Sequence, residues 1–281
     1  MEKSPLRVGV WQCAPALRRV AENAQRIDQA SASSEAQILI TPELSLTGYD
    51  VRDAVHELAM PAHELLHHLH PRQGRSVLVG FIERGDTGIP CNAAALVADR
   101  VQHLHRKLYL PTYGMFDEGR YFGRGQRLDL CTYERWKLGI LVCEDFWHPG
   151  LIYALAAQGM DALLVMAAGA GRGAWQGGMH GSPFASTGTW EGIARTTAQL
   201  YGIYVALCNR VGVEGALTFA GASLIVGPDG TVHQRAARVE EAMLEWEFDP
   251  EEIRRARTPY SHLRDDDPHL VIRALEQGLA R

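Results

Sequence analysis

Short apolar runs alternate with longer amphipathic stretches along most of this chain. A run of roughly four to eight apolar residues is typical of a buried strand, whereas apolar positions spaced by three and four residues are typical of a helix. The pattern predicts helices at 17–33, at 55–70 with Pro71 ending it, after Pro149, and around 190–201. It predicts strands at 6–13, 36–41, 77–83, 93–98, 101–105, 138–142, 162–167 and 231–235, with two more near Tyr204 and Leu224.

Strands and helices that alternate in this order indicate an α/β protein whose sheets are covered by helices. No linker, internal repeat or low-complexity stretch interrupts the 281 residues, a length near the upper limit for one hydrophobic core. We therefore expect a single domain over 1–281.

Composition and charge argue against several classes of protein. Apolar residues make up 46% of the chain, and no run of them approaches the roughly 18 to 20 residues that cross a bilayer. The net charge of −5 offers no electrostatic footprint for nucleic acid. The first residues contain no apolar segment of a secretory signal, and the five cysteines show no paired spacing. We therefore expect a cytoplasmic protein without membrane or nucleic-acid partners.

Three reactive side chains follow three of the predicted strands. Cys143 comes directly after an apolar run, and Glu43 and Lys107 come just after two others. Functional groups of α/β folds gather at strand ends, and a nucleophile on a strand-to-helix turn is exposed on a rigid backbone. Taken singly, a buried structural cysteine, a solvated carboxylate and a surface lysine are the simpler interpretations.

Together these segments resemble the nitrilase, or carbon-nitrogen hydrolase, superfamily, whose triad is Glu, Lys and Cys. Glu43, Lys107 and Cys143 occur in the chain order of that triad. The stretches 107–122 and 143–147 are most similar to the glutaminase domain of glutamine-dependent NAD synthetase. The resemblance covers nearly the whole chain, through the stretches 8–12, 39–49, 105–122, 138–147, 204–212, 219–230 and 257–265.

The resemblance implies a four-layer α-β-β-α sandwich and a thiol mechanism that needs no metal or organic cofactor. Glu43 would be the general base for Cys143. Lys107 and the backbone N–H of Glu144 would stabilise the oxyanion. Glu118 would orient Lys107 or the amide nitrogen of the substrate. The implied substrate-binding residues are Tyr49, Tyr113 and Glu144.

The implied reaction is hydrolysis of a non-peptide carbon-nitrogen bond in a small amide through a cysteine thioester, with release of ammonia or an amine. A nitrilase and an N-acyltransferase are the alternatives within the superfamily. The polar stretch that holds glutamine in the glutaminases is replaced here by Ala167–Ala170, and the chain has no S-G-G-x-D-S run of a synthetase. A glutaminase would therefore need a separate synthetase partner.

The matched motifs also bear on the substrate and on assembly. They contain the carboxylates Glu118 and Glu144 and no arginine aimed at a substrate carboxylate, while Arg172 and Arg195 lie in a segment that the pattern leaves open. Because an unpaired buried carboxylate is costly, we expect an amide that carries donor groups, such as an α-amino group, to be favoured over a nitrile.

The family further implies a homodimer or larger homo-oligomer, with the charged tail at about 249–281 in the interface.

A zinc hydrolase is the rival from another mechanistic class. The run 63–67 matches H-E-x-x-H, in which His63 and His67 would bind zinc from one face of a helix and Glu64 would be the base. The apolar stripe of the same helix would face the core, which leaves both histidines in solvent. This interpretation is therefore the weaker one.

Two further alternatives have less support. The run 169–174 matches the dinucleotide motif G-x-G-x-x-A, but Gly177, Gly178, Gly181 and Pro183 would break the helix that such a site needs. We interpret this run as a flexible wall or lid of the pocket. A catalytically silent binding protein of the same fold is the last alternative, and the intact triad argues against it.

Overall fold

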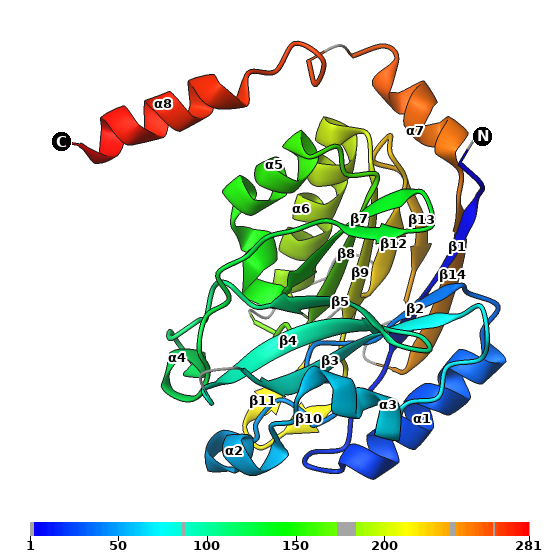
Figure 1. The fold of residues 1–281 in the computed structure, drawn as a ribbon, viewed down its shortest axis with the longest axis vertical. Coiled ribbons are helices and arrows are strands. Elements are labelled where there is room, and N and C mark those ends of the chain that lie inside the picture. Colours follow the sequence, from blue (N-terminus) through cyan, green and yellow to red (C-terminus); the bar gives the residue numbers. More distant parts are fainter. Residues whose placement is uncertain (1–2, 86–87, 173–183, 237–239, 261, 281) are drawn as a thin grey trace.

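The structure is a computed structural model that describes residues 3–85, 88–172, 184–236, 240–260 and 262–280. Two six-stranded sheets lie face to face, and helices cover their outer faces (Figure 1). The first sheet contains, in spatial order, β14 (Ala242–Phe248), β1 (Leu6–Gln12), β2 (Ile38–Ile40), β3 (Ser76–Arg84), β4 (Pro90–Val97) and β5 (Val101–Arg106). The second contains β13 (Val232–Arg235), β12 (Leu224–Val226), β9 (Tyr204–Asn209), β8 (Ala162–Ala167), β7 (Trp136–Val142) and β6 (Cys131–Tyr133).

The helices complete a four-layer α-β-β-α sandwich, which confirms the predicted architecture. The first sheet is covered by α1 (Val20–Ser33), α2 (Val55–Leu58) and α3 (Leu65–His68), and the second by α5 (Pro149–Ala157) and α6 (Ser186–Tyr201). The remaining elements are α4 (Glu118–Tyr121), the hairpin of β10 (Val213–Glu214) and β11 (Leu217–Thr218), and the C-terminal α7 (Pro250–Arg257) and α8 (Pro268–Leu279). Among the described helices, none combines the length and apolar character needed to cross a bilayer.

The hydrophobic core lies between the two sheets. Side chains alternate along each strand, so Ile38 and Ile40 of β2 join the inter-sheet cluster with Leu138 and Ile140 of β7. Leu39 points the other way and packs under α1 in a second cluster. The strands β1, β2 and β3 run parallel, as do β7, β8 and β9. The loops that follow β2, β7 and β8 are therefore held on a rigid and largely buried scaffold.

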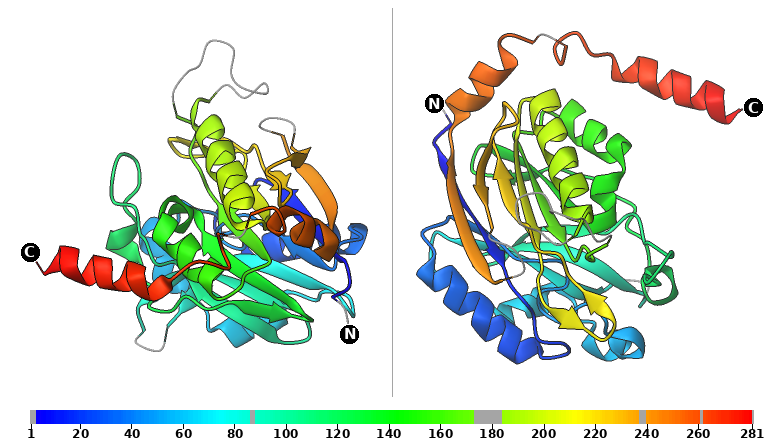
Figure 2. Two further views of the ribbon diagram at one scale, coloured as in Figure 1. Left: turned by 90° about the horizontal axis from the view of Figure 1, so that it is seen from above. Right: turned by 180° about the vertical axis from the view of Figure 1, so that it is seen from behind.

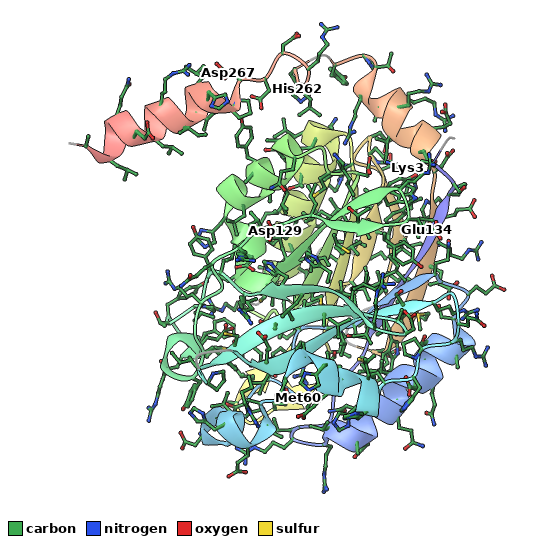
Figure 3. The ribbon with its side chains drawn as sticks, viewed as in Figure 1. Lys3, Met60, Asp129, Glu134, His262 and Asp267 are labelled. Carbon is green, nitrogen blue, oxygen red and sulfur yellow. The ribbon has the colours of Figure 1, made fainter. Side chains whose placement is uncertain are left out.

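Most predicted strands are confirmed, but one predicted helix is wrong. The segment 55–70 forms α2, a 3-10 helix at Ala62–Glu64 and α3, with an extended break between α2 and the 3-10 helix. Met60, labelled in Figure 3, donates its N–H to the carbonyl of Ile82 and accepts the N–H of Arg84, at 3.1 and 2.9 Å. A backbone that pairs with β3 cannot continue a helix, and Pro61 follows it directly.

Several boundaries also differ from the prediction, and the strands β6, β10, β11 and β14 were not predicted. The helix α1 begins at Val20 and α6 begins at Ser186, and β2 contains only Ile38–Ile40. The strand β14 was not predicted, although it pairs antiparallel with the whole length of β1. The tail forms two helices, and Figure 2 shows α8 extended away from the sheets. No residue of α8 is buried.

Candidate active site

Cys143 lies where β7 ends and a short 3-10 helix, Cys143–Trp147, begins. Its backbone is left-handed, with φ of +50°, which costs a residue with a side chain about 1–3 kcal/mol. The helix α5 then starts with Pro149 in its first turn, as predicted. This strand–turn–helix arrangement fixes the direction of the thiol.

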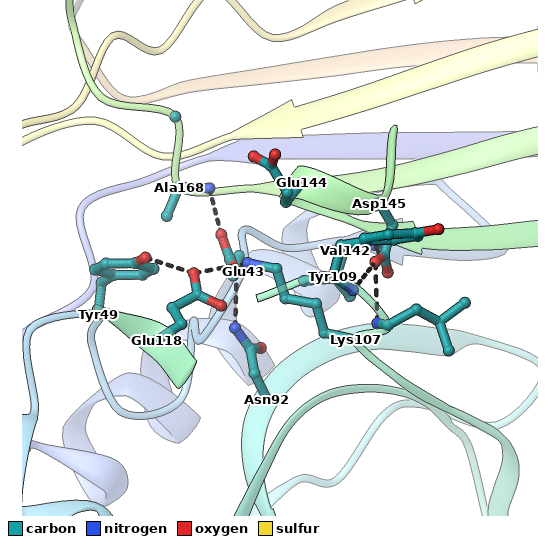
Figure 4. A network of polar contacts seen from close by, with 12 residues as sticks. Glu43, Tyr49, Asn92, Lys107, Tyr109, Glu118, Val142, Glu144, Asp145 and Ala168 are labelled. Carbon is teal, nitrogen blue, oxygen red and sulfur yellow. Dashed lines mark hydrogen bonds and ion pairs between the residues drawn. The ribbon is translucent and has the colours of Figure 1, made fainter. Parts of the chain in front are cut away.

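Glu43 lies in the tight turn that follows β2, and its side chain is fully buried. The turn packs on β3 at Gly80, where a Cβ would lie 2.4 Å from the backbone nitrogen of Leu44. Glycine is therefore required at this position. The Glu43 carboxylate accepts hydrogen bonds from Asn92 Nδ2 at 2.8 Å, through Oε1, and from the backbone N–H of Ala168 at 2.9 Å, through Oε2 (Figure 4).

Lys107 follows β5 and is held between two carboxylates. Its Nζ donates to Glu43 Oε1 at 2.6 Å and to Glu118 Oε1 at 2.7 Å, and all three side chains are buried. Burial alone would lower the pKa of Lys107, but Glu118 and Glu43 together raise it well above its usual value. The side chain is therefore an ammonium that donates two of its three protons to these carboxylates.

Glu118 begins α4 and links Lys107 to Tyr49. Its Oε1 accepts from Lys107 and from the Tyr49 hydroxyl at 2.5 Å, whereas its Oε2 is buried without a hydrogen-bond partner. Burial raises the pKa of Glu118 to about 7, with a further upward push from Glu43 and opposing effects of Lys107 and Tyr49. Glu118 therefore changes its protonation near neutral pH.

The Cys143 thiol is neutral in this environment. Burial raises its pKa well above the usual value, and the charge of Glu43 adds to the rise. Lys107 and the backbone N–H of Ala168 oppose it without reversing it. A base must therefore take the thiol proton before the sulfur can attack.

A cavity of about 170 Å³ opens onto Cys143. The three residues expected in a substrate pocket, Tyr49, Tyr113 and Glu144, all line it, and the Tyr113 hydroxyl donates to Glu144 at 2.9 Å. Arg172 lines it as well, with its guanidinium 5.0 Å from the Phe116 ring centre and 5.5 Å from that of Tyr113. Arg172, whose place the sequence pattern left open, therefore lies in the wall of this cavity.

Three contributors to the site were missed by the sequence analysis. Asn92 and the backbone of Ala168 bind Glu43, and Asp145 binds the loop after Lys107. Asn92 could have been noticed as a polar residue inside the apolar run 90–97. Ala168 contributes only its backbone N–H, so no pattern of side chains in the sequence indicates its role.

The rival motifs lie away from this cluster. His63 and His67 are exposed, in a 3-10 helix and in α3 respectively. Across the described residues, no group of three or more His, Cys, Asp and Glu side chains is arranged to hold a metal ion. Of the run 169–174, Gly169, Ala170 and Arg172 line the cavity. Residues 173 and 174 of this run, and the helix-breaking Gly177, Gly178, Gly181 and Pro183, lie outside the described residues.

The sequence profile of the carbon-nitrogen hydrolase family matches residues 7–258. The chain belongs to this family. It is similar to the glutamine-dependent NAD(+) synthetase of Acinetobacter baylyi, with 28% identity over 257 residues that cover 88% of this chain and 45% of the relative. The chain thus spans about half the length of the NAD synthetases it matches.

Solved structures of family members have the same fold. The carbon-nitrogen hydrolase from Helicobacter pylori G27 superposes with a TM-score of 0.81 at 22% identity, covering 97% of this chain and 99% of the other. A variant of the amidase from Nesterenkonia sp. AN1 superposes with a TM-score of 0.72 at 25% identity, covering 92% and 95%. That structure shows covalent addition of the acetamide moiety of fluoroacetamide at the active-site cysteine.

Proposed function

We propose that this carbon-nitrogen hydrolase cleaves small amides through a thioester on Cys143. The observation that carries the proposal is the position of Lys107. Its ammonium joins Glu43 and Glu118, and all three charges act on the thiol of Cys143, which lines the cavity. A buried cation, a carboxylate with a fixed orientation and a neutral thiol are the parts that nucleophilic acyl transfer needs.

The first half of the reaction forms the thioester. Glu43 accepts the proton of the Cys143 thiol as the sulfur attacks the amide carbon. The negative charge that develops on the amide oxygen is stabilised by the third proton of Lys107 and by the backbone N–H of Glu144. The carbon-nitrogen bond then breaks, and the amine leaves with the proton from Glu43.

The second half regenerates the enzyme. A water molecule takes the place of the departed ammonia or amine and gives a proton to Glu43. The resulting hydroxide attacks the thioester carbon, the carbon-sulfur bond breaks, and Cys143 recovers the proton from Glu43. The net reaction consumes one water and produces a carboxylic acid and ammonia or an amine, with no electron transfer.

The pocket suggests a small substrate with charged ends. A cavity of about 170 Å³ suits a short aliphatic chain. Arg172 is a permanent cation in it, which favours a substrate carboxylate, and Glu144 can accept from an amino group. Glutamine-type ω-amides fit this pair of charges, and the named activities of the synthetase and amidase relatives support an amide over a nitrile. Ammonia would pass to a separate synthetase if the protein serves as a glutaminase.

The test is ammonia release from a panel of ω-amides, neutral amides, carbamoyl amines and the nitriles that match them in length. We expect amides to be hydrolysed and Cys143→Ala to be folded and inactive. Glu43→Gln and Lys107→Met should each lose at least 10²- to 10³-fold, on the order of the loss of one oxyanion donor. A nitrile turned over tenfold better than its amide would favour a nitrilase, and activity retained in Cys143→Ala would exclude the thioester.

A further inference from the structure

A buried ion pair lies outside the residues that carry the proposed chemistry. Arg210 follows β9, Glu214 ends β10, and their side chains are only 1% and 4% exposed. Arg210 Nη1 lies 2.6 Å from Glu214 Oε1. Neither residue lines the cavity next to Cys143. Because charges are expensive to bury, a pair in this position calls for an explanation.

Glu214 connects this pair to the backbone of Tyr49. Its second oxygen, Oε2, accepts the N–H groups of Tyr49 at 2.9 Å and Asp50 at 2.8 Å. Gly48, with φ of +77°, leaves the necessary space, since a Cβ there would lie 2.9 Å from Glu214 Oε1. The carboxylate therefore anchors the loop that carries Tyr49 to the β10–β11 hairpin.

Arg210 also supports Tyr49 through an aromatic contact. Its guanidinium carbon lies 4.0 Å from the ring centre of Phe219, which is fully buried. The Phe219 ring meets the Tyr49 ring edge-on, with 5.8 Å between their centres. Arg210 thus reaches both the backbone of Tyr49, through Glu214, and its ring, through Phe219.

Tyr49 is the point at which this support meets the candidate site. Its hydroxyl donates to Glu118 Oε1 at 2.5 Å, on the same oxygen that binds Lys107 (Figure 4). We propose that Arg210 is a positioning residue, whose ion pair with Glu214 holds Tyr49 so that its hydroxyl stays on Glu118. This inference rests on the proposed function for its catalytic meaning, but the geometry that it describes is independent of the substrate.

Holding Tyr49 in place affects the ionisation of Glu118, which a purely structural ion pair would not do. Glu118 faces Lys107, Glu43, Tyr49 and Cys143, and the hydrogen bond from Tyr49 lowers its pKa. If Tyr49 is released, Glu118 loses that donor and its pKa rises above about 7. The pH at which Glu118 ionises therefore reports whether Tyr49 is in place.

The experiment compares Glu214→Gln, Tyr49→Phe and the double variant. Each is measured by the pH profile of kcat/KM for ammonia release and by the pH profile of Cys143 alkylation with iodoacetamide, which needs no substrate. We expect Glu214→Gln to lower kcat/KM roughly tenfold. We also expect it to shift the transition near pH 7 in both profiles to higher pH, in the same direction as Tyr49→Phe. Because both changes act through one hydrogen bond, the double variant should be little worse than the poorer single variant.

Asp161→Asn is the matched control. Asp161 is also a buried acid that pairs with a cation, Lys3, and accepts a backbone N–H, that of Lys137, but it precedes β8 at the end away from Ala168. This variant should lose stability while its pH profiles stay unchanged. Arg210→Lys keeps the charge without the planar fork, and we expect it to show a smaller shift than Glu214→Gln. It also serves in place of Glu214→Gln if that variant does not fold.

Two outcomes would overturn the proposal. One is that Glu214→Gln, or Arg210→Lys in its place, loses stability but keeps the wild-type pH profiles, as the control does. The other is that the losses in the double variant multiply. If the wild-type protein hydrolyses no amide, the proposed function fails, whereas the alkylation profiles still decide whether Arg210 and Glu214 hold Tyr49.

Discussion

His105 Nε2 and Asp145 Oδ2 lie 3.0 Å apart, and both side chains are almost completely buried. His105 belongs to β5, just before Lys107, and Asp145 lies two residues after Cys143. Asp145 Oδ1 also accepts the backbone N–H groups of Leu108 and Tyr109 at 3.0 and 2.8 Å (Figure 4). One carboxylate therefore ties the turn of the nucleophile to the strand end that carries the lysine.

The first prediction concerns this tie. Asp145→Asn keeps the size of the side chain but replaces one acceptor oxygen by an N–H₂ group that would face a donor. We expect it to lower the free energy of unfolding by about 2–4 kcal/mol, because buried donors lose a charged acceptor. We also expect kcat to fall, because the turn that carries Cys143 is no longer fixed relative to the strand end that carries Lys107. Denaturant unfolding and ammonia release measure the two effects, and wild-type stability in Asp145→Asn would contradict the account.

The second prediction concerns Glu118, whose pKa is raised from 4.5 to about 7. The folded protein binds this proton more tightly than the unfolded chain, so the contribution of Glu118 to stability is complete below pH 4.5 and is lost as the pH rises through about 7. Between these values, the free energy of unfolding should fall more steeply with pH in the wild type than in Glu118→Gln. Parallel curves for the two proteins would show that Glu118 ionises normally.

The third prediction concerns Arg172 and the charge of the substrate. The wild type should prefer an amide that ends in a carboxylate over the neutral amide of equal length. Arg172→Met should reduce this preference roughly 10- to 100-fold, because a charged hydrogen bond is worth about 1.5–3 kcal/mol. Arg195→Met is the control, since Arg195 binds the carbonyl of Gly230 and does not line the cavity. An unchanged preference in Arg172→Met would remove Arg172 from substrate binding.

The three residues of the implied triad could be predicted from the sequence because each follows an apolar strand and lies in a long, specific motif. The sequence could not predict how they are held. Ala168 contributes a backbone N–H, whose direction depends on where β8 lies relative to β2, and Asp145 binds residues about 40 positions away in the chain. Arg172 was left open because the glycine-rich stretch around it has no apolar period.

The errors in the predicted helices and strands arise because contacts between distant segments override the local sequence pattern. The apolar spacing over 55–70 is helical, but Met60 pairs with β3 and Pro61 follows it, so tertiary pairing overrides local propensity. The strand β14 alternates apolar and polar residues only in part, and it is stabilised by pairing with β1, more than 200 residues earlier. Such pairings cannot be recognised from the local pattern of one sequence.

The fourth prediction concerns assembly. The helix α8 carries exposed apolar side chains at Leu270, Val271, Ile272, Leu275 and Leu279, and it buries none of its residues in this chain. We expect it to pack on a neighbouring copy in a homodimer or larger oligomer, because such a helix is unstable alone in water. Light scattering should give at least a dimer for the full chain and a smaller species after Leu275→Glu. A monomeric full chain at micromolar concentration would contradict this prediction.

The measurement that tests the central claim most directly is the mass of the protein quenched with acid during turnover of an amide. The account predicts an acyl group on Cys143 and on none of Cys13, Cys91, Cys131 and Cys208, since none of these four lines the cavity that opens onto Cys143. The acyl group should persist longer in Glu43→Gln, because the base that activates water is lost. An acyl group found on another residue and not on Cys143, or Cys143→Ala as active as the wild type, would contradict the account.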